Sequence, residues 1–175
     1  MAFPGGKQDG DETETETCLR EAHEEIGLEA SDVEIIAPIP PRISRHNIVV
    51  SPVIGLVSPH FRPTVNTSEV EVAFKLPLSR FLTVQGHRTV ESSFRGRSFQ
   101  LPFFDDDVDG RVICTWGLTA VVCIELAIGM FERLPEFEFN AIPFGEEGVF
   151  TNDPFHHQIK YIADLEYRLL HNAKL

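Results

Sequence analysis

The pattern of apolar and polar positions predicts an amphipathic helix near the start of the chain, over residues 13–26. At about 100° per residue, its apolar side chains fall on one arc and can be buried together. They are Cys18, Leu19, Ala22 and Ile26. Thr13 with Glu16 matches a capping box, and Asp11 is the alternative N-cap. Gly27 stands where a left-handed C-terminal cap is expected.

Alternating and β-branched residues predict strands after this helix. Prolines and other turn residues separate these runs and predict loops, above all at residues 58–66. The expected strands cover residues 33–39, 47–58, 70–76, 89–104 and 111–115. Residues 47–58 form either one strand or a pair of strands, and residues 89–104 form a hairpin that turns at 95–97. A further turn is expected at residues 105–110.

Apolar segments predict further helices. Residues 116–130 are almost continuously apolar, which predicts a helix buried across one face of a sheet. Residues 153–170 have an apolar stripe at helical spacing, and residues 77–82 begin with Pro and predict a short helical turn. No repeat or linker divides the chain, so we expect one domain of the α/β class over residues 1–175.

The composition narrows the classes of partner. A net charge of −12 disfavours nucleic-acid backbones and anionic membranes, and Glu125 interrupts the longest apolar run before it reaches the roughly 18 residues of a membrane span. We therefore expect no nucleic-acid partner and no membrane span. The cysteines are odd in number and lack metal-type spacing, which indicates reduced, packed thiols of an intracellular protein. They are Cys18, Cys114 and Cys123.

Three glutamates of the first predicted helix lie on one face, beside its apolar arc. Viewed down the helix, Glu24 and Glu25 lie about 60° and 40° to either side of Glu21. Like charges at this spacing repel unless a cation sits among them. Oxygen ligands of this kind suit Mg²⁺, Mn²⁺ or Ca²⁺ rather than zinc. The alternative is a solvated acidic face, because Glu is a good helix former.

The spacing of glycines and charges around these glutamates resembles the Nudix box, G-x5-E-x7-R-E-U-x-E-E-x-G-U. The matching positions are Gly6, Glu12, Arg20, Glu21, Glu24, Glu25, Gly27 and Leu28. Ala22 departs from the pattern, which has a bulky aliphatic residue there, and the change removes packing volume but no chemical group. The resemblance implies an α/β/α sandwich with a mixed sheet, and a loop-helix-loop that binds divalent metal and hydrolyses a nucleoside diphosphate linked to another moiety.

Roles for the box residues follow from this resemblance. Glu21, Glu24 and Glu25 would bind Mg²⁺ or Mn²⁺. Glu24, Glu21 and Arg20 would be the catalytic residues. Arg20 is suited to orienting the glutamates by bidentate pairing, because its guanidinium is planar and always charged.

Other residues have supporting roles in this interpretation. Glu12 can tie the glycine loop to the helix, and the backbone carbonyl of Gly5 or Gly6 would be a further metal ligand. A box glutamate is the first choice for the general base. Glu69 or Glu71 is the second choice.

Motifs outside the box resemble the coenzyme A diphosphatase subgroup of Nudix hydrolases. They are Phe3-Pro4-Gly5-Gly6-Lys7, the pair Glu69-Val70 followed by Pro77-Leu78, and Trp116-Gly117-Leu118-Thr119-Ala120. The resemblance implies hydrolysis of coenzyme A or acyl-CoA to 3′,5′-ADP and (acyl-)4′-phosphopantetheine. The alternatives are another nucleoside diphosphate, such as NADH or ADP-ribose, and an inactive form that acts only as a binding module.

The two ends of the chain add two expectations. Nudix folds, by family resemblance, place strands ahead of the box, and the box here begins almost at Met1, so we expect an N-terminally truncated Nudix domain. The tripeptide Ala173-Lys174-Leu175 is a variant of the Ser-Lys-Leu peroxisomal address. We expect the peroxisomal import receptor to bind it, or a cytoplasmic location if the tripeptide is not exposed.

Overall fold

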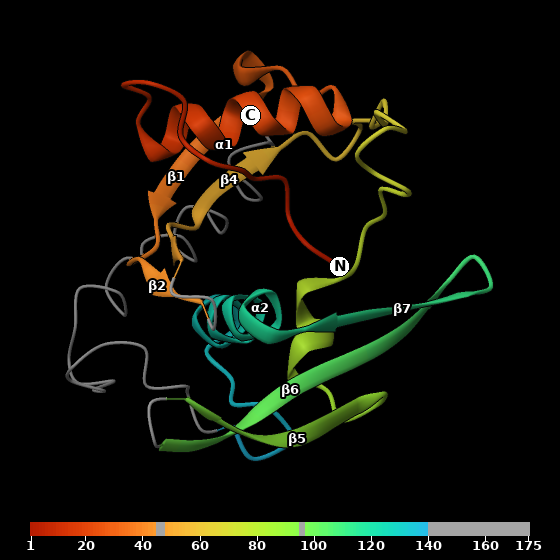
Figure 1. Ribbon diagram of the computed structural model, residues 1–175. Coiled ribbons are helices and arrows are strands. Elements are labelled where there is room, and N and C mark those ends of the chain that lie inside the picture. Colours follow the sequence, from red (N-terminus) through yellow and green to blue (C-terminus); the bar gives the residue numbers. More distant parts are fainter. Residues whose placement is uncertain (45–47, 95–96, 140–175) are drawn as a thin grey trace, which may run out of the picture. The chain divides into compact units, whose positions relative to one another are not determined.

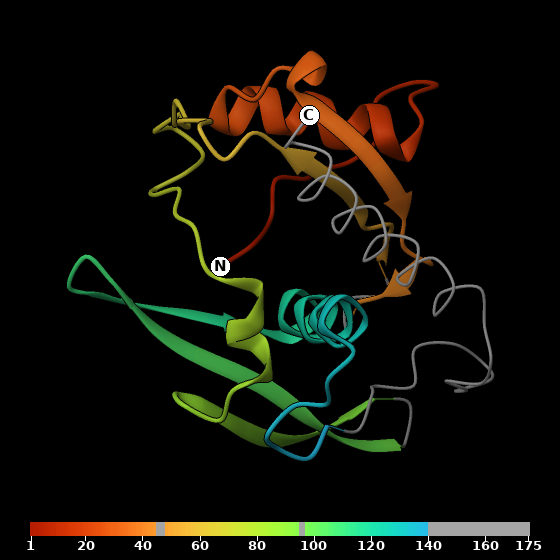
Figure 2. The ribbon, with the colours of Figure 1, turned by 180° about the vertical axis from the view of Figure 1, so that it is seen from behind.

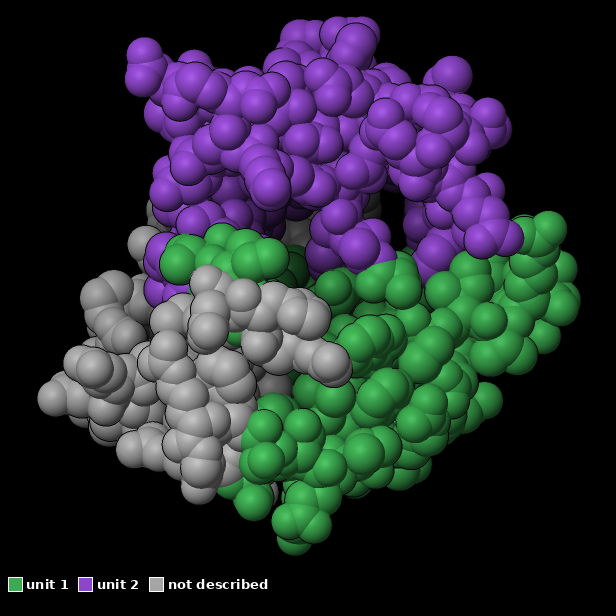
Figure 3. All heavy atoms as spheres, in the orientation of Figure 1, with its two compact units in different colours: residues 1, 42–49, 76–175 green, residues 2–41, 50–75 purple. Residues whose placement is uncertain are grey.

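A computed structural model describes residues 1–44, 48–94 and 97–139 (Figure 1). The chain divides into two compact units (Figure 3). Unit 1 consists of Met1, Arg42–Val49 and Leu76–Leu175, and unit 2 consists of Ala2–Pro41 and Val50–Lys75. The expectation of one domain stays a prediction, and each unit is described by itself below.

Unit 2 begins with the predicted box helix, α1, at Glu14–Ile26. The capping box at its start is confirmed: the Glu16 N–H donates to Thr13 Oγ1 at 3.2 Å, and the Thr13 N–H donates to Glu16 Oε2 at 2.8 Å. The helix ends at Gly27, whose φ of 66° is in the left-handed region. Leu28 then packs back against the helix and is buried.

Two antiparallel strands lie beside α1 in unit 2, as Figures 1 and 2 show from opposite sides. A single 3₁₀ turn, η1 (Ala30–Asp32), leads into β1 (Val33–Pro38), which pairs with β4 (Val53–Val57). The predicted strand at 33–39 and the strand pair at 47–58 are confirmed. The pair consists of β3 (Val49–Val50) and β4, and β3 forms a short two-stranded sheet with β2 (Arg42–Ile43).

Unit 1 contains a three-stranded antiparallel sheet with one helix on it (Figures 1 and 2). The strands are β5 (His87–Phe94), β6 (Arg97–Val108) and β7 (Arg111–Trp116), and the helix is α2 (Gly117–Phe131). A 3₁₀ helix, η2 (Leu78–Leu82), confirms the predicted turn at 77–82. The hairpin of β5 and β6 is likewise confirmed.

The core of unit 1 explains why α2 is apolar on almost every side. The side chains of Phe104 and Ile124 are fully buried, and the ring of Phe81 meets Phe104 edge-on at 5.1 Å between centroids. A helix that is apolar all round is buried, and eight residues of α2 are buried in this structure. The prediction of a buried helix at 116–130 is therefore confirmed.

One strand prediction and one turn prediction were wrong. Residues 70–76 form no strand, and none of the ladders among the described residues includes them. The segment follows a turn, in which the N–H groups of Glu69 and Val70 both donate to the Asn66 carbonyl, at 3.1 and 2.9 Å. The predicted turn at 105–110 is also too long. Residues Asp105 to Val108 continue β6 in register with β7, and only Asp109-Gly110 turns, with positive φ at both residues.

The α/β class is confirmed, and the larger ladders of the described residues are antiparallel. The predicted helix at 153–170, the tripeptide at 173–175 and most of the hairpin turn at 95–97 lie outside the described residues. Within the described part of the chain, no helix has the length and apolar character needed to cross a membrane. The three cysteines are free thiols, and burial raises the pKa of Cys123 to about 12.

Candidate functional site

Arg20 lies at the centre of the box and contacts three of its carboxylates. Its Nε and Nη2 donate to the two oxygens of Glu12 at 2.9 and 3.3 Å, which is a bidentate pair. Its Nη1 donates to Glu21 Oε1 at 2.9 Å and to Glu24 Oε2 at 3.3 Å. One guanidinium thus positions residues from the loop and from two turns of α1.

Glu12 joins the glycine loop to the helix, as the sequence interpretation expected. Its Oε2 accepts the Asp9 N–H at 3.1 Å and the Thr17 hydroxyl at 3.0 Å. The hydrogen bond from Arg20, followed by that from the Asp9 backbone, lowers the pKa of Glu12 to about 2. Glu12 is therefore ionised at any physiological pH.

The glycine loop approaches the helix closely at Gly6. A Cβ atom at Gly6 would lie 2.0 Å from Glu21 Oε1, so any other residue would force this carboxylate to move. Gly5 has no atom within 4 Å of its Cβ position, and its N–H donates to Glu25 Oε1 at 3.4 Å. The two glycines thus act differently: Gly6 by lacking a side chain, Gly5 through its backbone.

A second loop closes the C-terminal end of α1. The N–H of Thr64 donates to the Ile26 carbonyl and the N–H of Asn66 to the Glu25 carbonyl, both at 2.9 Å. Gly27 packs against this loop, since a Cβ there would lie 3.1 Å from Thr64 Cβ. The pattern of prolines marked residues 58–66 as a loop, but it contained no signal for this docking.

The docked loop brings Glu69 close enough to Glu25 to affect its charge. Burial raises the pKa of Glu25 most, and the negative charges of Glu21 and Glu69 raise it further, against the lowering effect of the Gly5 N–H. Glu71, the other candidate base, is an exposed residue two positions further on. The charge of Glu69 therefore acts on a carboxylate of the box.

Several contacts of the site were missed by sequence reasoning. Thr17 is buried and bonds Glu12, and the Lys7 carbonyl accepts from Arg20 Nη2 at 3.0 Å. Asp9 lies 4.0 Å from the same guanidinium nitrogen. The position of Thr17, one helical turn after the N-cap Thr13, was the signal in the sequence that could have predicted its contact with Glu12. The Lys7 contact depends only on the path of the backbone and has no residue signature.

The donor set of the box fits a divalent cation in type and charge. The single positive charge of Arg20 is shared among three carboxylates, and Glu25 adds a fourth carboxylate beside them, so the box carries excess negative charge. Carboxylate oxygens are the ligands that Mg²⁺ and Mn²⁺ prefer. Among the described residues, however, no three acidic, histidine or cysteine side chains converge on one metal position. The metal ligands Glu21, Glu24 and Glu25 stay a prediction.

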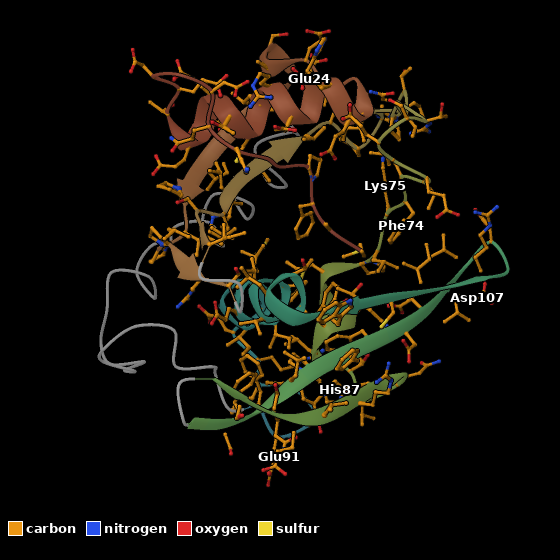
Figure 4. All side chains as sticks on the ribbon, viewed as in Figure 1. Glu24, Phe74, Lys75, His87, Glu91 and Asp107 are labelled. Carbon is orange, nitrogen blue, oxygen red and sulfur yellow. The ribbon has the colours of Figure 1, made fainter. Side chains whose placement is uncertain are left out.

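Unit 1 holds a separate cavity of about 430 Å³, lined by His87, Arg88, Thr89, Gln100, Phe137 and Glu138. The ring of His87, labelled in Figure 4, stacks on Phe137 at 3.7 Å between centroids. Burial, and then the charge of Arg80, lower the pKa of His87. None of the residues predicted from the box lines this cavity.

Comparison with known proteins agrees with the geometry of the box. The NUDIX domain family matches residues 1–90. Nudix hydrolase 15, mitochondrial, of Arabidopsis thaliana is 36% identical over 140 residues, which cover 78% of this chain and 49% of that protein. Peroxisomal coenzyme A diphosphatases of Mus musculus and Caenorhabditis elegans are each 32% identical, over 80% and 78% of this chain and 61% and 57% of those proteins.

The chain thus spans between 49% and 61% of the length of these relatives. The family match includes every residue of the box, from the glycine loop to Leu28, and it extends over the loop that carries Glu69. It covers half of the chain, and within the box Arg20 pairs with Glu12 and the backbone of Gly6 closely approaches Glu21. The chain belongs to the Nudix family.

Proposed function

We propose that the chain hydrolyses the diphosphate bond of coenzyme A or acyl-CoA, with Mg²⁺ or Mn²⁺, to 3′,5′-ADP and (acyl-)4′-phosphopantetheine. The observation that carries the hydrolytic part is the cluster of carboxylates that Arg20 holds against the glycine loop. When bound, the divalent cation neutralises the diphosphate and lowers the pKa of the attacking water. Glu21, Glu24 and Glu25 would hold it, with the carbonyl of Gly5 or Gly6 as a further ligand.

The chain's own residues prepare this chemistry by positioning. Arg20 Nη1 donates to Glu21 and Glu24 at 2.9 and 3.3 Å and so orients both carboxylates, and Glu12 holds Arg20 in turn. A box glutamate is the proposed general base. Glu69 or Glu71 is the second candidate, and the charge of Glu69 already acts on Glu25.

The choice of coenzyme A rests on the two relatives named peroxisomal coenzyme A diphosphatases and on the motifs outside the box. Other relatives of similar identity are named only as Nudix hydrolases. NADH and ADP-ribose are therefore the competing substrates. A single assay of phosphomonoester formation with coenzyme A, acetyl-CoA, NADH and ADP-ribose decides between them, with the highest kcat/KM expected for coenzyme A or its acyl form.

The competing function from another class is a binding module without turnover. Equilibrium binding of the same four compounds to the protein, measured beside the turnover assay, distinguishes the two functions. Binding without hydrolysis in Mg²⁺ and in Mn²⁺ would reject the enzymatic proposal. Hydrolysis at more than trace rates would reject the binding-module alternative.

Peroxisomal location belongs to the same proposal. It is supported by the names of two relatives, while others are named mitochondrial and chloroplastic. The prediction that the import receptor binds Ala173, Lys174 and Leu175 is tested by imaging an N-terminally tagged chain in cells. Loss of a peroxisomal signal on deletion of these three residues is the expected result, and diffuse cytoplasmic signal in the unaltered chain would contradict the prediction.

A further inference from the structure

Two cationic side chains meet on the loop that closes the C-terminal end of α1. Lys75 Nζ donates to the carbonyls of Pro59 and Phe61 at 3.1 and 3.2 Å. Arg62 Nη1 donates to the carbonyls of His60 and Phe61, both at 3.3 Å. Both cations thus reach the same Phe61 oxygen, and their nitrogens are at most about 6.5 Å apart. Figure 4 labels Lys75, which lies on the segment that follows this loop in the sequence.

Among the described residues, neither cation has an acidic partner. Within the described part of the chain, Arg62 and Lys75 make no ion pair, and their acceptors are backbone carbonyls. This is unexpected in a chain with 27 acidic and 15 basic residues, where a carboxylate is seldom far from a cation. Two like charges held together repel each other, and a bound anion relieves the repulsion. Both residues are exposed, so a solute can reach them.

The pair lies near the box within the same compact unit. Thr64 and Asn66 tie the loop to the last turn of α1 through the carbonyls of Ile26 and Glu25. Arg62 precedes Thr64 by two residues, so their Cα atoms are at most about 7 Å apart. An anion on Arg62 and Lys75 would therefore lie on the border of the site and not among its carboxylates.

We propose that Arg62 and Lys75 form a subsite for the 3′-phosphate of coenzyme A, and so select substrates that carry a phosphomonoester on the ribose. This inference deepens the proposed function and rests on it. A phosphomonoester is close to dianionic at neutral pH and offers three acceptor oxygens. The guanidinium of Arg62 can bind two of them, and the ammonium of Lys75 supplies a point charge to the third. NADH and ADP-ribose have no such group.

The test is a binding measurement that does not depend on turnover. Calorimetric titration of the whole chain in EDTA compares 3′,5′-ADP with 5′-AMP, which differs only by the 3′-phosphate. The wild type is expected to bind 3′,5′-ADP at least about tenfold more tightly. Arg62→Gln and Lys75→Gln are each expected to reduce this preference severalfold without weakening 5′-AMP. Arg133→Gln removes the same charge from an exposed position of unit 1 and is expected to leave the preference unchanged.

The controls separate selectivity from loop structure and from the proposed activity. If Lys75 only braced the loop, its substitution would weaken both nucleotides equally, and that outcome overturns the proposal. Equal affinity of the wild type for both nucleotides also overturns it, as does inorganic phosphate bound as tightly as 3′,5′-ADP, which would indicate a free-phosphate site. A chain that prefers 3′,5′-ADP but hydrolyses no substrate would refute the proposed function and keep the subsite.

Discussion

Gly6 and Glu21 are in such close approach that a methyl group on Gly6 would lie 2.0 Å from Glu21 Oε1. The obstructed atom is the end of a flexible side chain, so the carboxylate would move and the backbone would not. The relationship links a residue without a side chain to a predicted metal ligand. A substitution of Gly6 is therefore expected to change the position of Glu21 without preventing folding.

Gly6→Ala is expected to fold with little loss of stability but to lose about tenfold or more in kcat, because the displaced Glu21 no longer meets Arg20 correctly. Gly5→Ala is the matched control, since its Cβ would have no atom within 4 Å. Thermal melting and steady-state kinetics of both variants make the comparison. Equal activity of the two variants would show that the close approach has no catalytic role.

Glu24→Gln keeps the size of the side chain and removes its charge. We expect a normal melting temperature and a loss of at least about 100-fold in turnover with Mg²⁺ or Mn²⁺, the scale of lost metal or acid-base assistance. Glu14→Gln, on the exposed first turn of α1, is the control and should retain activity. Retained activity in Glu24→Gln would refute its assignment.

Arg20→Lys keeps the charge and loses the planar fork. A lysine cannot hold Glu12 through two bonds while it also contacts Glu21, so we expect a lower melting temperature and a kcat reduced by about tenfold to 100-fold. Arg133→Lys, at an exposed position, is the control substitution. Unchanged kinetics in Arg20→Lys would mean that charge alone, and not the fork, organises the carboxylates.

The pH dependence of stability should report on Glu12. Its folded-state pKa of about 2 lies below the ordinary glutamate pKa of 4.5, chiefly because Arg20 bonds the ionised form. The stabilisation from a lowered carboxylate pKa is present above the unfolded-state value and is lost as pH falls through the folded-state value. Stability should therefore fall between about pH 5 and pH 2. Glu12→Gln should be less stable at pH 7 and lose less over that interval, as measured by denaturant unfolding.

Unit 1 contains a buried ion pair that tests its packing independently of the box. Glu125, buried in the apolar helix α2, accepts from Arg42 Nη2 at 3.0 Å, and burial raises the pKa of Glu125 against the effect of Arg42. Arg42→Met leaves a buried carboxylate without its partner and should cost about 3–5 kcal/mol of unfolding free energy.

The double variant Arg42→Met with Glu125→Met should recover much of that loss, because it leaves no unpaired buried charge. Urea unfolding of the single and double variants measures the coupling between the two residues. Additive losses would contradict a specific pair interaction.

Local signals determined much of this protein from its sequence. Thr13, Glu16 and Gly27 bounded α1 correctly, since capping depends on residues within one turn of the helix end. The apolar run at 116–130 identified α2 because a helix without a polar face must be buried. The box spacing predicted that Arg20 orients the neighbouring glutamates, and Arg20 does contact Glu21 and Glu24, but its bidentate partner is Glu12.

Contacts between distant segments were decided only by the tertiary structure. Residues 70–76 alternate like a strand, but none of the ladders among the described residues includes them, and alternation alone cannot supply a partner strand. The approach of Gly6 to Glu21, and of the 58–66 loop to the end of α1, depends on how the backbone folds back over tens of residues. The sequence alone predicted the chemistry of the site, because that prediction depends on residue types at helical spacing. Its close packing and its neighbouring cation pair required the fold, because they arise from backbone atoms that carry no residue signature.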